Sequence, residues 1–121
     1  DETRLVSGDS SGAVRLFDAR TGEMLREERN SGFVNYVLFS PDGRQYVSAS
    51  LDGKALVRDT ATGSTLFPAL TNSATIYSID YSADGNYIAT AGLDGVAKVW
   101  DANTGKELHT LQTSSAQVLV V

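Results

Sequence analysis

The fold of this chain is decided by the stretch Thr90-Ala91-Gly92-Leu93-Asp94-Gly95-Val96-Ala97-Lys98-Val99-Trp100-Asp101, because related stretches occur at two earlier places. Residues 7–18 and 48–59 carry the same order of small, acidic and apolar residues. Equivalent glycines stand 41 and 42 residues apart, at Gly12, Gly53 and Gly95. A period of roughly 20 to 50 residues is typical of solenoids, propellers and other stacked arrays. We therefore expect a repeat architecture.

Each repeat has the pattern of four short antiparallel strands joined by turns. In the middle repeat the strands are predicted at residues 33–39, 45–50, 54–59 and 64–70. The turns Ser40-Pro41-Asp42-Gly43 and Leu51-Asp52-Gly53 separate them, because Pro fixes φ and Asp-Gly favours a tight hairpin. No stretch of ten or more residues has a convincing helical period. One antiparallel sheet per repeat is the prediction.

The first predicted strand of the middle repeat is apolar on both faces. Val37 and Phe39 point to one side of the sheet, and Tyr36 and Leu38 point to the other. Such a sheet must be covered on both faces. Stacking similar sheets around an axis meets this need, because each sheet covers its neighbour.

The sequence resembles the WD40 repeat family. The stretches that carry the resemblance are Phe39–Gly43 and Tyr81–Gly85, which match a family turn, and Thr90–Asp101, which ends in the Trp-Asp signature. The resemblance covers nearly the whole chain and recurs in register. It implies an all-β fold of WD40-type β-propeller blades, each of four antiparallel strands, with three blades' worth of strands per chain.

The resemblance also implies a buried bracing network within each blade. In the family, a His, a Ser or Thr, an Asp and the Trp form this hydrogen-bonded tetrad. The tetrad-like residues of this chain are Ser48 and Asp52 in the second repeat and Thr90, Asp94 and Trp100 in the third. The position of the His is taken by Asn30, Asn72 and Ser114. No repeat can therefore build the full network, and Asp52 or Asp94 would need other partners if buried.

The phase of the repeats predicts an open array. Residues 1–121 form one array with units at about 1–29, 30–71 and 72–113. The chain begins with a second strand, and residues 114–121 match an innermost first strand. Three blades are too few to close, because propellers have roughly 4 to 8. The open ends therefore need a cover.

We expect the C-terminal strand of one chain to complete the N-terminal blade of another, giving a closed homo-oligomeric ring. The residues assigned to ring closure are Leu5, Val6, Val118, Leu119 and Val120. A homodimer would supply six blades and is favoured, and a homotrimer would supply nine. The competing interpretation is a segment of a larger propeller, whose remaining blades would then be the partner.

Composition excludes several classes of partner. The net charge of −5 leaves no basic excess for binding phosphates, so nucleic acid is not an expected partner. The chain has no Cys and one His, so no metal site and no cofactor are assigned. No apolar run reaches membrane-spanning length, and the first residues are unlike a signal peptide. A membrane is not an expected partner, and the cytoplasm is the favoured location.

No catalytic residue is assigned either. A Ser/His/Asp site would need His109, which lies in a predicted outermost strand. Residues 80–85 resemble the opening of a calcium loop, but Ala91 stands where the bidentate Glu should be, so they are interpreted as a turn. The chain is not expected to be an enzyme.

Binding of a partner at the surface is the remaining candidate function. The resemblance places the loops before the innermost strands and those between second and third strands on one rim. The candidates there for binding a partner are Asn30, Phe33, Tyr36, Leu51, Asn72, Thr75, Tyr77 and Leu93. The expected function is a non-catalytic scaffold for a protein or peptide. The alternatives are a structural, engineered or evolutionary propeller fragment that self-assembles into a ring, and a propeller that binds a small ligand or sugar.

Overall fold

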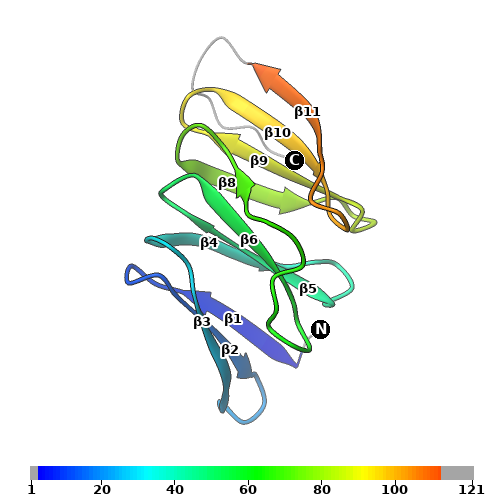
Figure 1. Ribbon diagram of the computed structural model, residues 1–121. Helices are drawn as coiled ribbons and strands as arrows, with labels where there is room; N and C mark the ends of the chain where they lie inside the picture. The colour runs from blue at the N-terminus through cyan, green and yellow to red at the C-terminus, as the bar shows by residue number, and fades with distance from the viewer. Residues whose placement is uncertain (1–2, 113–121) are drawn as a thin grey trace.

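Three antiparallel sheets stand in a row along the chain in the computed structural model, which describes residues 3–112 (Figure 1). The first sheet has the order β1 (Arg4–Gly8), β2 (Ala13–Asp18) and β3 (Met24–Arg29). The second has β4 (Val34–Phe39), β5 (Gln45–Ser50), β6 (Lys54–Asp59) and β7 (Leu70–Thr71). The third has β8 (Ile76–Tyr81), β9 (Tyr87–Gly92), β10 (Val96–Asp101) and β11 (Glu107–Gln112). The predicted all-β fold with one sheet per repeat is confirmed.

The tight turns between strands depend on glycine where the sequence predicts it. Gly53, between β5 and β6, has a φ of 85°, which side chains of other residues rarely allow. A Cβ at this position would also stand 2.8 Å from the carbonyl oxygens of Asn72 and Ala74. Gly53 therefore permits both the hairpin and the close approach of the loop that leads to the third sheet.

The fourth strand of the second sheet is much shorter than predicted. The expectation of a strand over residues 64–70 is wrong for most of its length, because only Leu70–Thr71 and one bridge between Arg58 and Thr65 pair with β6. Pro68 lies in the irregular part, and proline has no N–H to give to a strand ladder. The chain bends at this point instead of pairing continuously.

The inner strands of the second and third sheets carry matching β-bulges. The register shifts between Val34 and Tyr36 and again between Ile76 and Ser78, which leaves Asn35 and Tyr77 as the extra residues. Asn35 uses its position to donate a hydrogen bond from Nδ2 to the carbonyl oxygen of Ile76, at 2.8 Å. The bulge thus links the inner strands of neighbouring sheets.

Two apolar clusters lie between the sheets. Val14, Val34 and Tyr46 form the first, between sheets one and two, with Val37 and Phe39 packed against it. The second lies between sheets two and three, and its buried residues are Val47, Ala49, Ala55, Val57, Leu70, Ile76, Ile79, Tyr81, Ile88, Trp100 and Ala102. Leu38 packs against this second cluster, so the predicted alternation along β4 is confirmed. Each face of the middle sheet is covered by a neighbour.

Within residues 3–112 the first sheet has three strands where the other two have four. Its inner edge strand is β1, whose neighbour in the adjoining sheet is β4, linked through a 3.0 Å hydrogen bond from Val34 N to the carbonyl oxygen of Asp9. The predicted closing strand, with Val118, Leu119 and Val120, lies outside the described residues.

Candidate interaction rim

A row of four residues crosses one rim of the second and third sheets. The amide of Leu51 donates to the carbonyl oxygen of Phe33 at 2.9 Å. The hydroxyl of Thr75 donates to the carbonyl oxygen of Leu51 at 2.6 Å, and the amide of Leu93 donates to the carbonyl oxygen of Thr75 at 3.0 Å. These four residues, Phe33, Leu51, Thr75 and Leu93, are called the rim strip below. Hydrogen bonds hold all four backbones at fixed spacing.

The rim strip presents apolar side chains to solvent. Phe33 is 46% exposed, Leu51 is 44% exposed and Leu93 is 54% exposed. The repeat explains the arrangement, because Leu51 and Leu93 occupy the same place in the turn after the second strand of their sheets. Single exposed leucines are common on proteins, but three large apolar side chains on one hydrogen-bonded row form a contact surface.

Two carboxylates flank the rim strip. Asp94 follows Leu93 and accepts hydrogen bonds from the Ser73 hydroxyl and, at 3.1 Å, from the amide of Val96. The hydrogen bond from Ser73 is the main cause that lowers the pKa of Asp94 from its ordinary value. Asp52 repeats the arrangement with Ser31 in the second sheet. The surface therefore combines apolar side chains with negative charge.

The other predicted rim candidates lie elsewhere. Asn72, a predicted candidate for binding a partner, has a buried side chain with 4% exposure, so it does not offer a contact at the surface. Asn30 is half-buried and its amide group is turned toward the second sheet. Tyr36 is 40% exposed on β4, and Tyr77 is half-buried at the bulge of β8. The structure thus brings together four of the predicted residues and separates the others.

Asn72 instead braces the third sheet. Trp100 donates from Nε1 to the Thr90 hydroxyl at 3.0 Å, and that hydroxyl donates to Oδ1 of Asn72 at 2.8 Å. Asn72 therefore serves as an acceptor at the place where the family pattern has His. Asp94 does not join this chain of hydrogen bonds, since its side chain is exposed and bonded to Ser73 and Val96. The third sheet thus keeps the Thr and the Trp of the tetrad, replaces the His and leaves the carboxylate outside.

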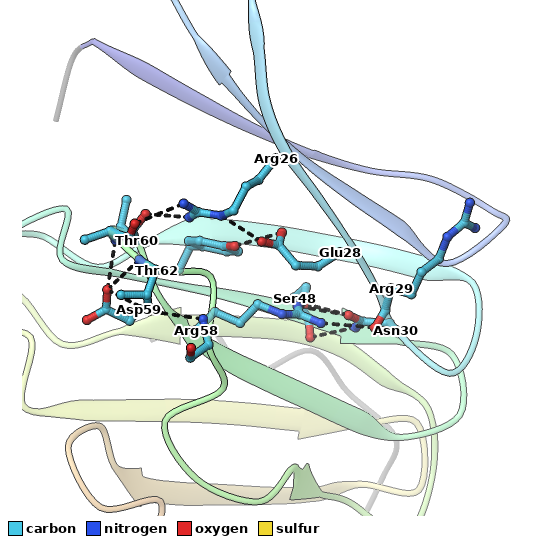
Figure 2. A network of polar contacts seen from close by, with 12 residues as sticks. Arg26, Glu28, Arg29, Asn30, Ser48, Arg58, Asp59, Thr60 and Thr62 are labelled. Carbon is cyan, nitrogen blue, oxygen red and sulfur yellow. Dashed lines mark hydrogen bonds and ion pairs between the residues drawn. The ribbon is translucent and has the colours of Figure 1, made fainter.

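The second sheet builds a different version of this network around Arg58 (Figure 2). Arg58 is 3% exposed and donates from Nη1 to the Ser48 hydroxyl at 2.9 Å and to Oδ1 of Asn30 at 3.1 Å. Its Nη2 donates to the carbonyl oxygen of Arg29 at 3.1 Å. Ser48 in turn donates to Oδ1 of Asn30 at 3.0 Å. A guanidinium thus fills the place that Trp100 holds in the third sheet.

A second group of polar contacts lies beside Arg58 and joins sheets one and two. Tyr46 donates from its hydroxyl to Oε2 of Glu28 at 3.0 Å, and Arg26 pairs with Oε1 of the same carboxylate at 2.9 Å. Arg26 also donates to the carbonyl oxygen of Thr60 at 2.6 Å. Burial lowers the pKa of Arg58, while the charge of Glu28 acts in the opposite direction. The ion pair of Glu28 is with Arg26, and these contacts tie sheet one to sheet two beside the buried guanidinium.

Arg58 is the structural residue that the sequence prediction missed. The signal was present, because Arg58 stands in register with Trp100 at the signature position of the repeat. Glu28 on β3 gave no comparable signal, since its role depends on which side chain of the next sheet it meets.

The described part of the chain offers few side-chain groups for catalysis or metal binding. Residues 3–112 contain no cluster of three or more His, Cys, Asp or Glu side chains that could hold a metal ion. His109 is exposed on β11. Among these residues there is also no helix long and apolar enough to cross a membrane.

Comparison with known proteins supports the repeat architecture. The profile of the family described as "WD domain, G-beta repeat" matches residues 22–59 and 65–101. A WD repeat-containing protein of Schistosoma mansoni, SL1-17, is 36% identical over 70 residues, which cover 58% of this chain and 23% of that protein. The chain thus spans less than a quarter of this curated relative.

Two computationally designed proteins of known structure have a similar fold. Ika8 superposes with a TM-score of 0.86 at 27% identity, over 95% of this chain and 36% of that chain. Ika4 superposes with a TM-score of 0.83 at 27% identity, over 95% of this chain and 69% of that chain. In each case nearly all of this chain matches only a part of the other protein.

Proposed function

Because the chain belongs to the WD40 repeat family, we propose that it is a non-catalytic module whose rim strip binds a protein or peptide partner. The observation that carries this proposal is the row of exposed Phe33, Leu51 and Leu93 on a hydrogen-bonded backbone. A backbone that hydrogen bonds already hold in place loses little further conformational entropy when a partner binds.

The chemistry of the rim strip defines the partner. Apolar side chains of the partner would pack on Leu51 and Leu93, and a Lys or Arg would face the carboxylates of Asp52 and Asp94. The net charge of −5 adds long-range attraction for a basic segment. We therefore propose a peptide segment that mixes apolar and basic residues.

Selection from a library of displayed random peptides tests this proposal. We expect the selected peptides to be enriched in apolar and basic residues. Leu51→Asp should weaken the best of them at least about tenfold, because it places a charge in an apolar contact. Titration of the purified chain with a labelled peptide measures the affinity.

Leu66→Asp is the matched control. Leu66 is 41% exposed, close to the exposure of Leu51, but lies in the irregular segment before β7 and away from the rim strip. The control should bind like the unchanged chain. Equal losses in the two variants, or selected peptides that bind Leu51→Asp normally, would contradict a binding role for the rim strip.

We also propose a second property, that the chain is a unit of a closed ring. The observation in its favour is the first sheet, which has three strands within residues 3–112 and has β1 as its inner edge. In this proposal residues 117–121 of another copy pair with β1, along Leu5 and Val6, in a homodimer of six blades or a homotrimer of nine. The remaining blades of a longer propeller are the alternative partner.

Deleting residues 117–121 tests this strand exchange. We expect the mass measured by light scattering to fall to that of one chain, because β1 loses the strand that covers its edge. An unchanged oligomer would show that this segment does not bridge copies.

A further inference from the structure

The two ends of the row of sheets each present a face that no other described strand covers. On the first sheet this face carries Leu5 and Phe17, which stand opposite each other in register. On the third sheet it carries Val99 and Leu111, on β10 and β11. Leu5 is 51% exposed and Leu111 is 52% exposed. Within residues 3–112, both faces thus expose a leucine that no neighbouring sheet covers.

The strand registers show which residues are equivalent to Leu5. Leu5 pairs with Phe17 in the first sheet, as Tyr46 pairs with Arg58 in the second and Ile88 with Trp100 in the third. Tyr46 and Ile88 both point toward the preceding sheet, where Tyr46 lies in the first apolar cluster and Ile88 in the second. Leu5 therefore occupies the position that faces a preceding sheet.

Leu111 is placed by the same reasoning. Leu111 pairs with Ala97, as Leu70 pairs with Ala55 and Glu28 with Val14. Glu28 and Leu70 both face the following sheet. Leu111 therefore occupies the position that faces a following sheet.

These two positions meet at both interfaces inside the chain. Between sheets one and two, the hydroxyl of Tyr46 bonds to Oε2 of Glu28 at 3.0 Å. Between sheets two and three, Ile88 and Leu70 belong to one buried cluster. Leu5 and Leu111 hold the same two positions at the two ends of the row of sheets, and both side chains are apolar.

An empty space beside Leu5 supports the same pairing. It is found by comparing three equivalent glycines, one in each sheet. Gly63 lies against Arg26 of the preceding sheet, since a Cβ there would stand 2.6 Å from Arg26 Nε. Gly105 lies equally close to Phe67, at 2.7 Å from Cγ. Gly22, the equivalent residue of the first sheet, has no atom within 4 Å of such a Cβ.

This vacant place is a hollow of about 300 Å³ in the first sheet. It is lined by Leu5, Phe17, Asp18, Ala19 and Gly22. The third-sheet residue in register with Arg26 is His109, because Arg26 pairs with Leu16 as His109 pairs with Val99. His109 is therefore the side chain that a following copy of the interface would bring to this hollow.

We propose that a second copy of this chain packs head to tail on the first, with its Leu111 against Leu5 and Phe17 and its His109 in the hollow. The inference rests on the proposed ring unit and names the faces that join its copies. The contact is heterologous, because different faces of the two copies meet, so it forms a ring when the rotation closes. Two apolar faces of matching register favour such packing over exposure to water.

A charge exchange tests the contact. Light scattering of the unchanged chain should give at least twice the chain mass of 12.9 kDa. Leu5→Lys and Leu111→Glu, each alone, should reduce the measured mass to one chain, because each puts a charge against a leucine. The double variant should recover the oligomer, because the introduced ammonium and carboxylate groups then face each other across copies.

Several outcomes would overturn the proposal. They are a single-chain mass for the unchanged protein, an unchanged mass in either single variant, and a double variant that stays a single chain while its circular dichroism is native. Leu66→Asp is the control for an added exposed charge and should keep the oligomer. If a charged variant does not fold, Leu5→Ala and Leu111→Ala should each raise the dissociation constant at least about tenfold, and normal association of both would equally overturn it.

The result separates this inference from the other proposals. Leu5→Lys leaves the rim strip intact, so binding of a selected peptide should survive in the single-chain form. An oligomer that resists deletion of residues 117–121 but is broken by Leu5→Lys would retain the face contact and reject strand exchange. If no selected peptide binds the rim strip, the mass measurements still test the contact between copies.

Discussion

Replacing Trp100 with alanine is expected to lower the free energy of unfolding by about 3–5 kcal/mol, the usual cost of removing a large aromatic side chain from a core. Trp100 is 6% exposed and packs in the cluster between sheets two and three. It also donates the hydrogen bond to Thr90 that begins the bracing chain to Asn72. The substitution therefore creates a cavity and removes a buried donor together.

Urea unfolding followed by circular dichroism measures this effect. Fluorescence is unsuitable, because Trp100 is the one tryptophan of the chain. Protein concentration is held fixed, since association of copies would change the apparent stability. Trp100→Phe is the control: it keeps most of the ring volume and should cost less than the alanine variant. A loss below about 1 kcal/mol for Trp100→Ala would contradict the placement of this ring in a packed core.

Arg58→Ala is expected to lower the free energy of unfolding by about 2–4 kcal/mol, because hydrogen bonds from a charged group contribute about 1.5–3 kcal/mol and packing is lost as well. The guanidinium is buried and bonds to Ser48, Asn30 and the carbonyl oxygen of Arg29. The same urea experiment measures the change.

Two variants show whether the geometry or the charge of Arg58 matters. Arg58→Lys keeps the charge but cannot reach three acceptors with a planar fork, so an intermediate loss is expected. Arg44→Ala removes an arginine that is exposed at the surface, and should change stability by less than about 0.5 kcal/mol. A loss in Arg58→Ala no larger than in Arg44→Ala would show that the network of the second sheet does not brace it.

The strands and turns were largely predictable from the sequence, for reasons that are local. The predicted strands at residues 45–50 and 54–59 match β5 and β6, because alternation and an Asp-Gly turn act between near neighbours. The prediction of a strand over residues 64–70 is wrong, because Pro68 interrupts the ladder although the segment is apolar. The missing N–H of proline outweighs apolar content there.

The bracing networks were predictable only in part. Trp100 donates to Thr90, and Ser48 donates to Asn30, which stands where the family pattern has His. Asp52 and Asp94 do not join, because each bonds to a serine of the neighbouring loop and remains at the surface. Which of several nearby donors a carboxylate selects depends on three-dimensional spacing, which the repeat pattern does not contain.

The rim strip was predictable as a set of loops but not as a row. The family resemblance implied one rim for Phe33, Leu51, Thr75 and Leu93, together with Asn72, which is buried. The amides of Leu51 and Leu93 each donate within their own sheet, and the Thr75 hydroxyl donates to Leu51 across the two sheets. This last bond depends on how the sheets stack rather than on any one repeat.

Hydrogen–deuterium exchange shows whether a partner binds at the rim strip. The chain is compared alone and saturated with a selected peptide. Binding there should slow exchange in segments 30–33, 51–54, 72–75 and 93–96, including the amides of Leu51 and Leu93 that donate along the strip. Slower exchange confined to the opposite turns, at residues 18–22, 59–63 and 101–105, with the rim segments unchanged, would contradict it.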